Sequence, residues 1–400
     1  MNILYLGYWA AADPLTVAVI DPRLKILSKT KEVNQLVFCS FERDSKNAEV
    51  DQLPNIKHIQ FHSRPGRNLF LTKFDDFTAW PVFIKTLVDE YKINLIIANS
   101  PLAGGAAYLT WRSRRVPFIV ECFEPHADYM VESAIWKKWD LRYWILKYFE
   151  RMQKKYAWRL QTVSHNYTNR LVAEGISKSR IITLPNVLKT ETFQFNQQDR
   201  ITKRAALNFS EQALVGIYVG KFGGIYYEQE AFDLFAKAFQ FFGSNFRMII
   251  LSPQDSNFIL SNLESRNIDK HHVFVSSVPH AKVPYYLSAA DFAFATIKPA
   301  PSRIYCCPVK NGEYWANGLP ILLEEGIGDD SEIIKTKGGG VIFNQKNPVE
   351  GFKQISDMTK VGRIQLAEKI VAIAEKHRSA ELMKEAYKDI IHDYGQGAFT

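Results

Sequence analysis

The chain has 400 residues, of which 46% are hydrophobic and 23% charged, and its formal net charge is +8. This length exceeds what one hydrophobic core usually accommodates, so we expect two domains. The composition excludes a fibrous, low-complexity or membrane-spanning protein, because no stretch approaches the roughly 18 apolar residues that cross a bilayer. The positive charge is compatible with an anionic partner, either nucleic acid or a membrane face.

The four cysteines form neither a disulfide framework nor a Cys-x-x-Cys metal pattern, which favours a reducing compartment. The sequence enters a strand at residues 2–6 without the basic start and apolar run of a signal peptide. We therefore expect a cytoplasmic protein.

The first half alternates short apolar runs with helical patterns, as β-α-β units of a parallel sheet do. Strands are expected at 3–6, 34–40, 58–61, 95–98, 118–122 and 160–163. Helices are expected at 24–29, 80–91, 105–114, 134–156 and 166–174. We assign residues 1–195 to an N-terminal domain and interpret the polar stretch 196–203 as the linker.

A second series of the same kind fills residues 204–375, the expected C-terminal domain. Its strands are expected at 214–219, 248–251, 273–275, 292–296, 321–323 and 340–343. Apolar residues at helical spacing continue beyond 361, and residues 376–400 are expected to form a terminal helix. The fold class is therefore α/β, with two parallel sheets.

The stretch from Cys307 to Pro320 is the most informative part of the chain. It places Lys310 and Glu313 in a loop just ahead of a helix and between two expected strands, near the edge where open α/β sheets bind ligands. Taken alone, Lys310 could be a solvated surface lysine, and Glu313 could simply complement the N-terminus of the helix.

A second candidate follows the strand at 214–219, where Lys221 precedes the pair Gly223 and Gly224. Glycines let the backbone approach a diphosphate and offer N–H groups to it, while a lysine neutralises its charge. The alternative is an ordinary tight turn after a strand.

Together these segments resemble nucleotide-sugar glycosyltransferases of the GT-B fold, family 4 type. Residues 313–320 are similar to the family's Glu-Ala-Met-Ala-x-Gly-x-Pro signature, and Lys221 stands where the family has an arginine. The resemblance is specific in the second half and loose in the first. It implies two Rossmann-like domains with a cleft between them, and a C-terminal helix that crosses back to the first domain.

The resemblance also implies roles for individual residues. Glu313 would accept hydrogen bonds from the donor ribose, and Lys221, Gly223 and Gly224 would face the diphosphate. The segment from Ser276 to Val278 would contact the base through backbone groups.

Two departures from the family pattern affect the site. The first glutamate of the family's Glu-(x)7-Glu pair falls on Tyr305, and Tyr226 replaces a second basic residue after the glycines. We expect Lys310 to supply the missing charge. Residues 308–314 fit a Pro-x-Lys-x-x-Glu-Tyr version found in some similar enzymes, in which backbone amides near 305–308 could hold the sugar.

In the first domain, Glu124, His126 and Asp128 follow the strand at 118–122. The family commonly places a histidine there, near the reacting sugar carbon, so His126 is the candidate catalytic residue and Glu124 the second. A purely structural histidine is the alternative. Gly7 and the loop 8–14 are expected to leave room for the donor phosphate.

Residues 136–159 combine many cations with aromatic side chains. Interfacial helices have this character, although a core helix with solvated lysines has it too. A lipid-linked acceptor would explain such a surface at the inner face of the cytoplasmic membrane. Nucleic acid is not expected, because no binding module is recognised.

The sequence thus predicts a transferase that moves a sugar from a nucleotide-diphosphate sugar to an acceptor hydroxyl. The acceptor is expected to be a lipid-linked or polysaccharide glycan, in surface polysaccharide or lipopolysaccharide assembly. Family resemblance implies retention of configuration. No cofactor is expected, and no metal, since the Asp-x-Asp triplet of GT-A enzymes is absent. Two alternatives stay open: a GT-B nucleotide-sugar 2-epimerase, and a non-catalytic protein that binds glycans or nucleotide sugars.

Overall fold

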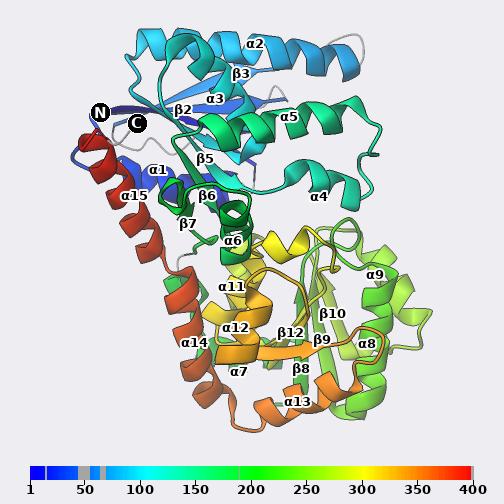
Figure 1. Ribbon diagram of the computed structural model, residues 1–400. Helices are drawn as coiled ribbons and strands as arrows, with labels where there is room; N and C mark the ends of the chain where they lie inside the picture. The colour runs from blue at the N-terminus through cyan, green and yellow to red at the C-terminus, as the bar shows by residue number, and fades with distance from the viewer. Residues whose placement is uncertain (14–15, 44–54, 64–68, 189, 398–400) are drawn as a thin grey trace. The chain divides into compact units, whose positions relative to one another are not determined.

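The computed structural model describes residues 1–13, 16–43, 55–63, 69–188 and 190–397. The chain divides into two compact units. Unit 1 comprises Met1–Pro185 and Glu381–Thr400, and unit 2 comprises Asn186–Ala380. Each unit is built around one parallel β-sheet (Figure 1). Within the described residues, no helix is both long and apolar enough to cross a bilayer.

The sheet of unit 1 has the strand order β3-β2-β1-β4-β5-β6-β7. Its strands are β1 (Asn2–Leu6), β2 (Gln35–Glu42), β3 (Ile56–His62), β4 (Leu95–Asn99), β5 (Phe118–Phe123), β6 (Arg159–Thr162) and β7 (Ile181–Thr183). Its helices are α1 (Asp21–Leu27), α2 (Leu69–Glu90), α3 (Ser100–Arg114), α4 (His126–Glu132), α5 (Leu141–Tyr156), α6 (His165–Ala173) and α15 (Ala380–Gly395). Helix α3 lies between α2 and α5 on one face of the sheet, and α1 and α15 lie on the other (Figure 1).

A buried polar network sits inside unit 1, around the Glu121 carboxylate on β5. Glu121 accepts hydrogen bonds from the hydroxyls of Tyr5, at 2.5 Å, and of Tyr387 on α15. The Arg23 guanidinium of α1 lies 3.2 Å away and is only 2% exposed. Because buried charges persist only when they are paired and hydrogen-bonded, these contacts fix α1 and α15 on the sheet.

The sheet of unit 2 has the order β10-β9-β8-β11-β12-β13, which repeats the winding of the first. Its strands are β8 (Leu214–Val219), β9 (Phe246–Leu251), β10 (Val273–Ser276), β11 (Phe292–Ala295), β12 (Ile321–Glu324) and β13 (Gly340–Phe343). Its helices are α7 (Gln197–Ala206), α8 (Gln229–Phe242), α9 (Ser256–Glu264), α10 (Val283–Ala289), α11 (Val309–Ala316), α12 (Asp330–Lys337), α13 (Val349–Thr359) and α14 (Arg363–Arg378).

Both faces of this second sheet are buried, since neighbouring strand residues point to opposite sides. Ile217 of β8 belongs to a core cluster that α10, α11, α12 and α14 cover. Tyr218, the next residue, belongs to a second cluster that α8, α9 and α13 cover. The strand ends are consequently the part of the sheet left for polar chemistry.

Two expectations about local structure were wrong. The helix expected at 134–156 begins only at Leu141, as α5, because the chain turns at Ala134, with φ +57°, and Asp140 caps α5 by accepting from the Arg142 N–H. The stretch 196–203 is not a linker, since most of it is the first part of α7. Asn196 caps that helix by accepting from the Asp199 N–H. Its polar residues reflect an exposed helix face.

Candidate functional site

The sheet of unit 2 has its topological switch point at β8, which lies between β9 and β11. Ligands of open α/β sheets bind beyond the carboxyl ends of the strands at such a point. The chain leaves β8 through a turn in which Gly223 and Gly224 have φ +84° and +66°. The Tyr226 N–H donates to the Gly223 carbonyl at 3.1 Å. The glycines are therefore required by the turn, which stands where a phosphate would approach.

Lys310 and Glu313 lie inside helix α11 and not in a loop ahead of it, contrary to expectation. Residues Asn311 and Gly312, which look like turn residues, are used in packing. Asn311 donates to Asp330 at 2.9 Å, and a Cβ on Gly312 would come within 2.5 Å of Leu188. The helix thus begins directly after Pro308, with Lys310 in its first turn.

The side chain of Lys310 reaches the glycine turn. Its Cε would lie 3.4 Å from a Cβ on Gly220, and its Nζ lies 5.7 Å from the ring centroid of Tyr226. Lys221 is exposed, and its carbonyl accepts from the Tyr218 hydroxyl. The structure therefore places one cation against the turn and a second on its exposed side.

Glu313 is nearly buried, at 5% exposure, and pairs with a residue that the sequence reading missed. Its Oε1 lies 2.8 Å from Nε2 of His280. The hydrogen bond with Glu313 raises the pKa of His280, and the charge of Lys310 opposes this. His280 follows the segment with Ser276 and Val278, so the contact joins two predicted parts of the site. No sequence motif connects His280 with Glu313; only the fold does.

The loop between β11 and α11 contains the two adjacent cysteines and Tyr305. The Cys307 thiol accepts from the Asn186 N–H at 3.1 Å, and burial raises its pKa to about 12. A thiol with so high a pKa is a poor nucleophile at neutral pH. Cys307 is accordingly a packing residue.

In unit 1, His126 is the first residue of α4, and its Nδ1 lies 3.0 Å from Glu124 Oε1. The two candidates thus form a pair at the carboxyl end of β5. Asp128 does not join them and instead accepts from Lys147 and from the Tyr143 hydroxyl, both at 3.1 Å.

Glu150 of α5 bonds to the backbone next to this histidine. Its Oε1 accepts from the Ala127 N–H at 2.8 Å, next to His126 in the chain. Burial raises the pKa of Glu150 to about 7, although the Ala127 N–H and Lys147 both act in the opposite direction. Glu150 was not predicted, because nothing in the pattern of α5 distinguishes it from a surface glutamate.

Gly7 lies directly after β1, at the same edge of the sheet as Glu124. A Cβ on Gly7 would come within 3.1 Å of both Ile20 and Phe38, so the absence of a side chain serves packing here. The loop expected to follow it extends to Pro14, which lies outside the described residues.

Comparisons with known proteins agree with this architecture. Residues 31–192 match the family described as Glycosyltransferase Family 4. Sucrose-phosphate synthase from Thermosynechococcus elongatus has a similar structure, with a TM-score of 0.76 at 13% identity, covering 99% of this chain and 100% of that one. Anabaena HepE in complex with UDP and glucose has a TM-score of 0.71 at 14% identity, covering 98% and 100%.

WaaG, a glycosyltransferase involved in lipopolysaccharide biosynthesis, has a TM-score of 0.68 at 14% identity, covering 97% of this chain and 99% of that one. No curated protein sequence matches the chain. At these identities the structural likeness establishes a common fold. The family match falls in the half of the chain where the sequence motifs were loosest.

Proposed function

Since this chain is a GT-B-fold protein of the glycosyltransferase family 4 type, we propose that it transfers a sugar from a nucleotide-diphosphate sugar to an acceptor hydroxyl. The observation that carries this proposal is the contact of Lys310 with the glycine turn after β8, with Glu313 one helical turn further along α11. The cation and the backbone N–H groups of the turn can bind a diphosphate, and the nearly buried carboxylate can accept hydrogen bonds from the ribose that follows it.

In the proposed reaction, charge develops on the departing nucleoside diphosphate. Lys310 and Lys221 neutralise it together with N–H groups of the turn at Gly223 and Gly224, since preorganised donors lower the energy of a charged leaving group. Glu313 holds the ribose by accepting from its hydroxyls. The segment from Ser276 to Val278 contacts the base.

His126 and Glu124 are the proposed catalytic residues at the reacting sugar. Their 3.0 Å contact supports this role, because the carboxylate orients the ring and leaves Nε2 to face a substrate. Transfer proceeds with retention of configuration, and without a metal ion because side-chain cations neutralise the diphosphate. Retention is tested by NMR of the product anomer, and metal independence by turnover in excess EDTA.

The acceptor is proposed to be a lipid-linked or polysaccharide glycan that the protein meets at an anionic membrane. Large hydrophobic side chains gather in the exposed part of residues 135–148: Ile135, Trp139, Leu141, Trp144, Ile145 and Tyr148. Exposed cations accompany them: Lys137, Lys138, Arg142, Arg151 and Lys155. Aromatic residues between cations suit the boundary between lipid headgroups and acyl chains.

Vesicle sedimentation tests this surface. Binding to vesicles with anionic lipid is expected to exceed binding to zwitterionic vesicles, and to fall about tenfold in a Trp139→Ser, Trp144→Ser variant. Phe241→Ser is the matched control, because Phe241 is an exposed aromatic on unit 2. Equal binding by the tryptophan variant and the wild type would rule out this face.

The donor site is tested by thermal shift and calorimetry with nucleoside diphosphates and nucleotide sugars. One nucleotide should stabilise the wild type, and Glu313→Ala should weaken its binding by about 1–3 kcal/mol, as expected for loss of charged hydrogen bonds. Glu325→Ala, which removes a mostly exposed carboxylate, serves as control. A response identical in Glu313→Ala and wild type would refute the site.

Turnover separates this proposal from the two alternatives. A transferase releases nucleoside diphosphate in proportion to acceptor. A 2-epimerase converts the sugar with no acceptor, and a non-catalytic protein binds the nucleotide sugar without consuming it. Either of the last two outcomes would replace the transferase assignment while leaving the nucleotide site intact.

A further inference from the structure

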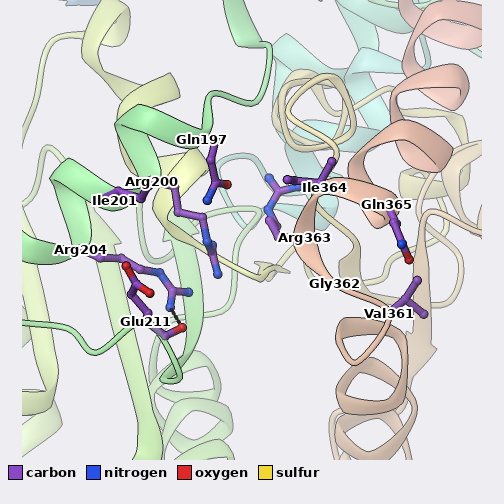
Figure 2. Close-up of a pocket in the computed structure, with 10 residues that line it drawn as sticks. All are labelled: Gln197, Arg200, Ile201, Arg204, Glu211, Val361, Gly362, Arg363, Ile364 and Gln365. Carbon is purple, nitrogen blue, oxygen red and sulfur yellow. Dashed lines mark hydrogen bonds between the residues drawn. The ribbon is translucent and has the colours of Figure 1, made fainter.

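A polar pocket in unit 2, away from the site described above, has a volume of about 390 Å³. It lies between the first turns of α7 and α14. Figure 2 shows Gln197 and Arg200 on one wall, and Arg363 and Gln365 on the other. Arg204 and Glu211 complete its polar lining. Three guanidinium groups thus face one small volume.

The pocket is at the opposite edge of the sheet from the glycine turn. Asp291, which binds two of the arginines, directly precedes β11 and accepts from the Val215 N–H at the start of β8, at 2.7 Å. The glycine turn follows the other end of β8. The two sites therefore do not share residues.

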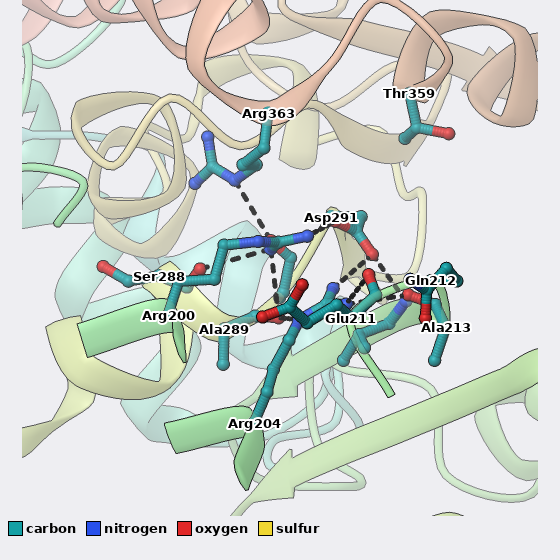
Figure 3. A network of polar contacts seen from close by, with 12 residues as sticks. Arg200, Arg204, Glu211, Gln212, Ala213, Ser288, Ala289, Asp291, Thr359 and Arg363 are labelled. Atoms are coloured by element: carbon teal, nitrogen blue, oxygen red, sulfur yellow. Dashed lines mark hydrogen bonds and ion pairs between the residues drawn. The ribbon is translucent and has the colours of Figure 1, made fainter. Parts of the chain in front are cut away.

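Arg200, Arg204 and Arg363 form an arginine cluster on the pocket wall. Part of this cluster has a structural role, which Figure 3 shows. Arg200 and Arg204 each bind one oxygen of Asp291, at 2.6 and 2.7 Å. Arg200 also donates to the carbonyls of Ser288 and Ala289 at the end of α10, at 3.4 and 3.2 Å. Cations at a helix C-terminus stabilise the helix, so these contacts explain Arg200 and Arg204 in part.

Arg363 is different, because all of its described bonds go to uncharged acceptors. It donates to the carbonyls of Ala290 and Gly318, at 3.1 and 2.9 Å, and to the carbonyl and side-chain oxygen of Asn317, both at 2.7 Å. Burial, together with the charges of Arg200 and Arg204, lowers the pKa of Arg363 to about 9, while Asp291 acts in the opposite direction.

The carboxylates of the cluster do not balance its cations. Asp291 is shared by Arg200 and Arg204, and Glu211 is the acidic residue on the pocket wall. Three guanidinium groups therefore face two carboxylates. A bound anion would remove the mutual repulsion that the position of Arg363 creates.

The backbone adds donors to the same pocket. Helix α14 begins at Arg363, after the N-cap residue Gly362, with no side-chain cap and no acidic residue in its first turn. Its first N–H groups belong to pocket residues 363–365. Gly362 has φ +98° and nothing within 4 Å of a Cβ position, so a ligand can come close to the backbone. Helix α7, on the other wall, already has its own cap in Asn196.

We propose that this pocket binds a small phosphate-bearing anion. Arg200 and Arg363 supply charge-assisted hydrogen bonds from opposite walls, and the first turn of α14 supplies N–H groups. The side chains of Gln197 and Gln365 at the rim would contact the uncharged part of the ligand. The site is separate from the nucleotide-sugar site and independent of the proposed reaction.

The test uses the full chain and inorganic phosphate as the probe, by calorimetry at fixed ionic strength with chloride as the balancing salt. Gln365→Glu and Gln197→Glu place a carboxylate at the rim. Both positions are exposed, so folding should be preserved. Either variant should weaken phosphate binding about tenfold, because like charges repel within a shared site. Lys337→Gln changes the net charge equally at an exposed position of α12, and this variant should bind phosphate as the wild type does.

Phosphate could also enter the glycine turn, so Lys310→Ala is measured beside the pocket variants. The proposal expects Lys310→Ala to bind phosphate as the wild type does, and both rim variants to bind it about tenfold more weakly. It is overturned if Lys310→Ala abolishes binding while the rim variants retain it, or if phosphate binds no better than chloride. Nucleotide binding in the rim variants should remain at the wild-type level, because the two sites share no residues. This expectation holds whether or not the protein is a transferase.

Discussion

The two sheets have the same winding but present different chemistry at the carboxyl ends of their strands. In unit 1, Glu121 is buried and bonded to Arg23 and to two tyrosines, while Glu124 pairs with His126. In unit 2, Lys221 and a pair of glycines follow the first strand, and the Glu313 carboxylate contacts the exposed His280. The shared winding therefore fixes where a site can lie, while the side chains decide whether that place serves stability or a ligand.

The largest expected effect comes from breaking the buried network of unit 1. Glu121→Ala removes the carboxylate beside Arg23 and the acceptor of Tyr5 and Tyr387. Leaving a charge buried without its partner should lower the free energy of unfolding by about 3–5 kcal/mol, measured by urea denaturation. Glu124→Ala, at a partly exposed position, should change it by less than about 1 kcal/mol. Similar losses in both variants would contradict the contrast between a structural and a site carboxylate.

A smaller effect is expected from Glu150, whose buried carboxyl has a pKa raised to about 7 from an ordinary 4.5. A raised pKa means that the protonated form stabilises the fold below pH 4.5, and that this contribution is lost as the pH rises through about 7. Glu150→Gln keeps an acceptor for the Ala127 N–H but cannot ionise. Between pH 5 and pH 8, the free energy of unfolding of the variant should therefore rise by about 1–3 kcal/mol relative to that of the wild type.

The measurement for Glu150 is the midpoint of urea unfolding across that pH range. Glu132→Gln, on the neighbouring α4, provides a carboxylate control at an exposed position. Parallel pH profiles of wild type and Glu150→Gln would show that Glu150 does not titrate between folded and unfolded states.

The smallest expected effect concerns unit 2, where His280 contacts Glu313, the carboxylate that we propose for the ribose. Its pKa is raised by Glu313, so their ion pair is present at low pH and is lost as the pH rises through that raised value. Because loss of the ion pair frees the Glu313 carboxylate, nucleotide affinity should increase by about threefold from pH 6 to pH 8 in the wild type. A change of this size corresponds to the free energy of an exposed ion pair.

His280→Ala should remove this dependence and bind at pH 6 as tightly as the wild type does at pH 8. Calorimetric titration of the nucleotide at both pH values gives the answer. His271→Ala is the control, because His271 is also an exposed histidine of unit 2 but pairs with Asp269 away from Glu313. A wild-type affinity that is flat with pH would mean that His280 does not compete with the ribose.

The sequence predicted the architecture well because alternating apolar runs and helices leave few ways to wind a sheet. The GT-B fold and the resemblance to family 4 are confirmed. The place of Lys310 and Glu313 after β11 also followed from their order in the chain. Their roles, like those of His126 and Lys221, stay predictions.

The errors arose where tertiary packing overrode local chemistry. Asn311 and Gly312 have the composition of a turn, yet the first bonds to Asp330 and the second allows close approach of Leu188, so a helix forms. The partnership of His280 with Glu313 joins segments far apart in sequence. Such contacts depend on the folded path of the chain and leave no local pattern to detect.

The bond between Tyr387 and Glu121 has a consequence for biosynthesis. The strands of unit 1 leave the ribosome early, but residues 186–380 must be translated before α15 exists. At about 5–20 residues per second, this interval lasts roughly 10–40 s. Throughout it, the nascent first sheet holds Arg23 and Glu121 without the hydroxyl that completes their network. A chain released before Tyr387 would therefore keep its first sheet but lack this hydrogen bond and most of α15, and it should be cleaved by proteases more readily than the full chain.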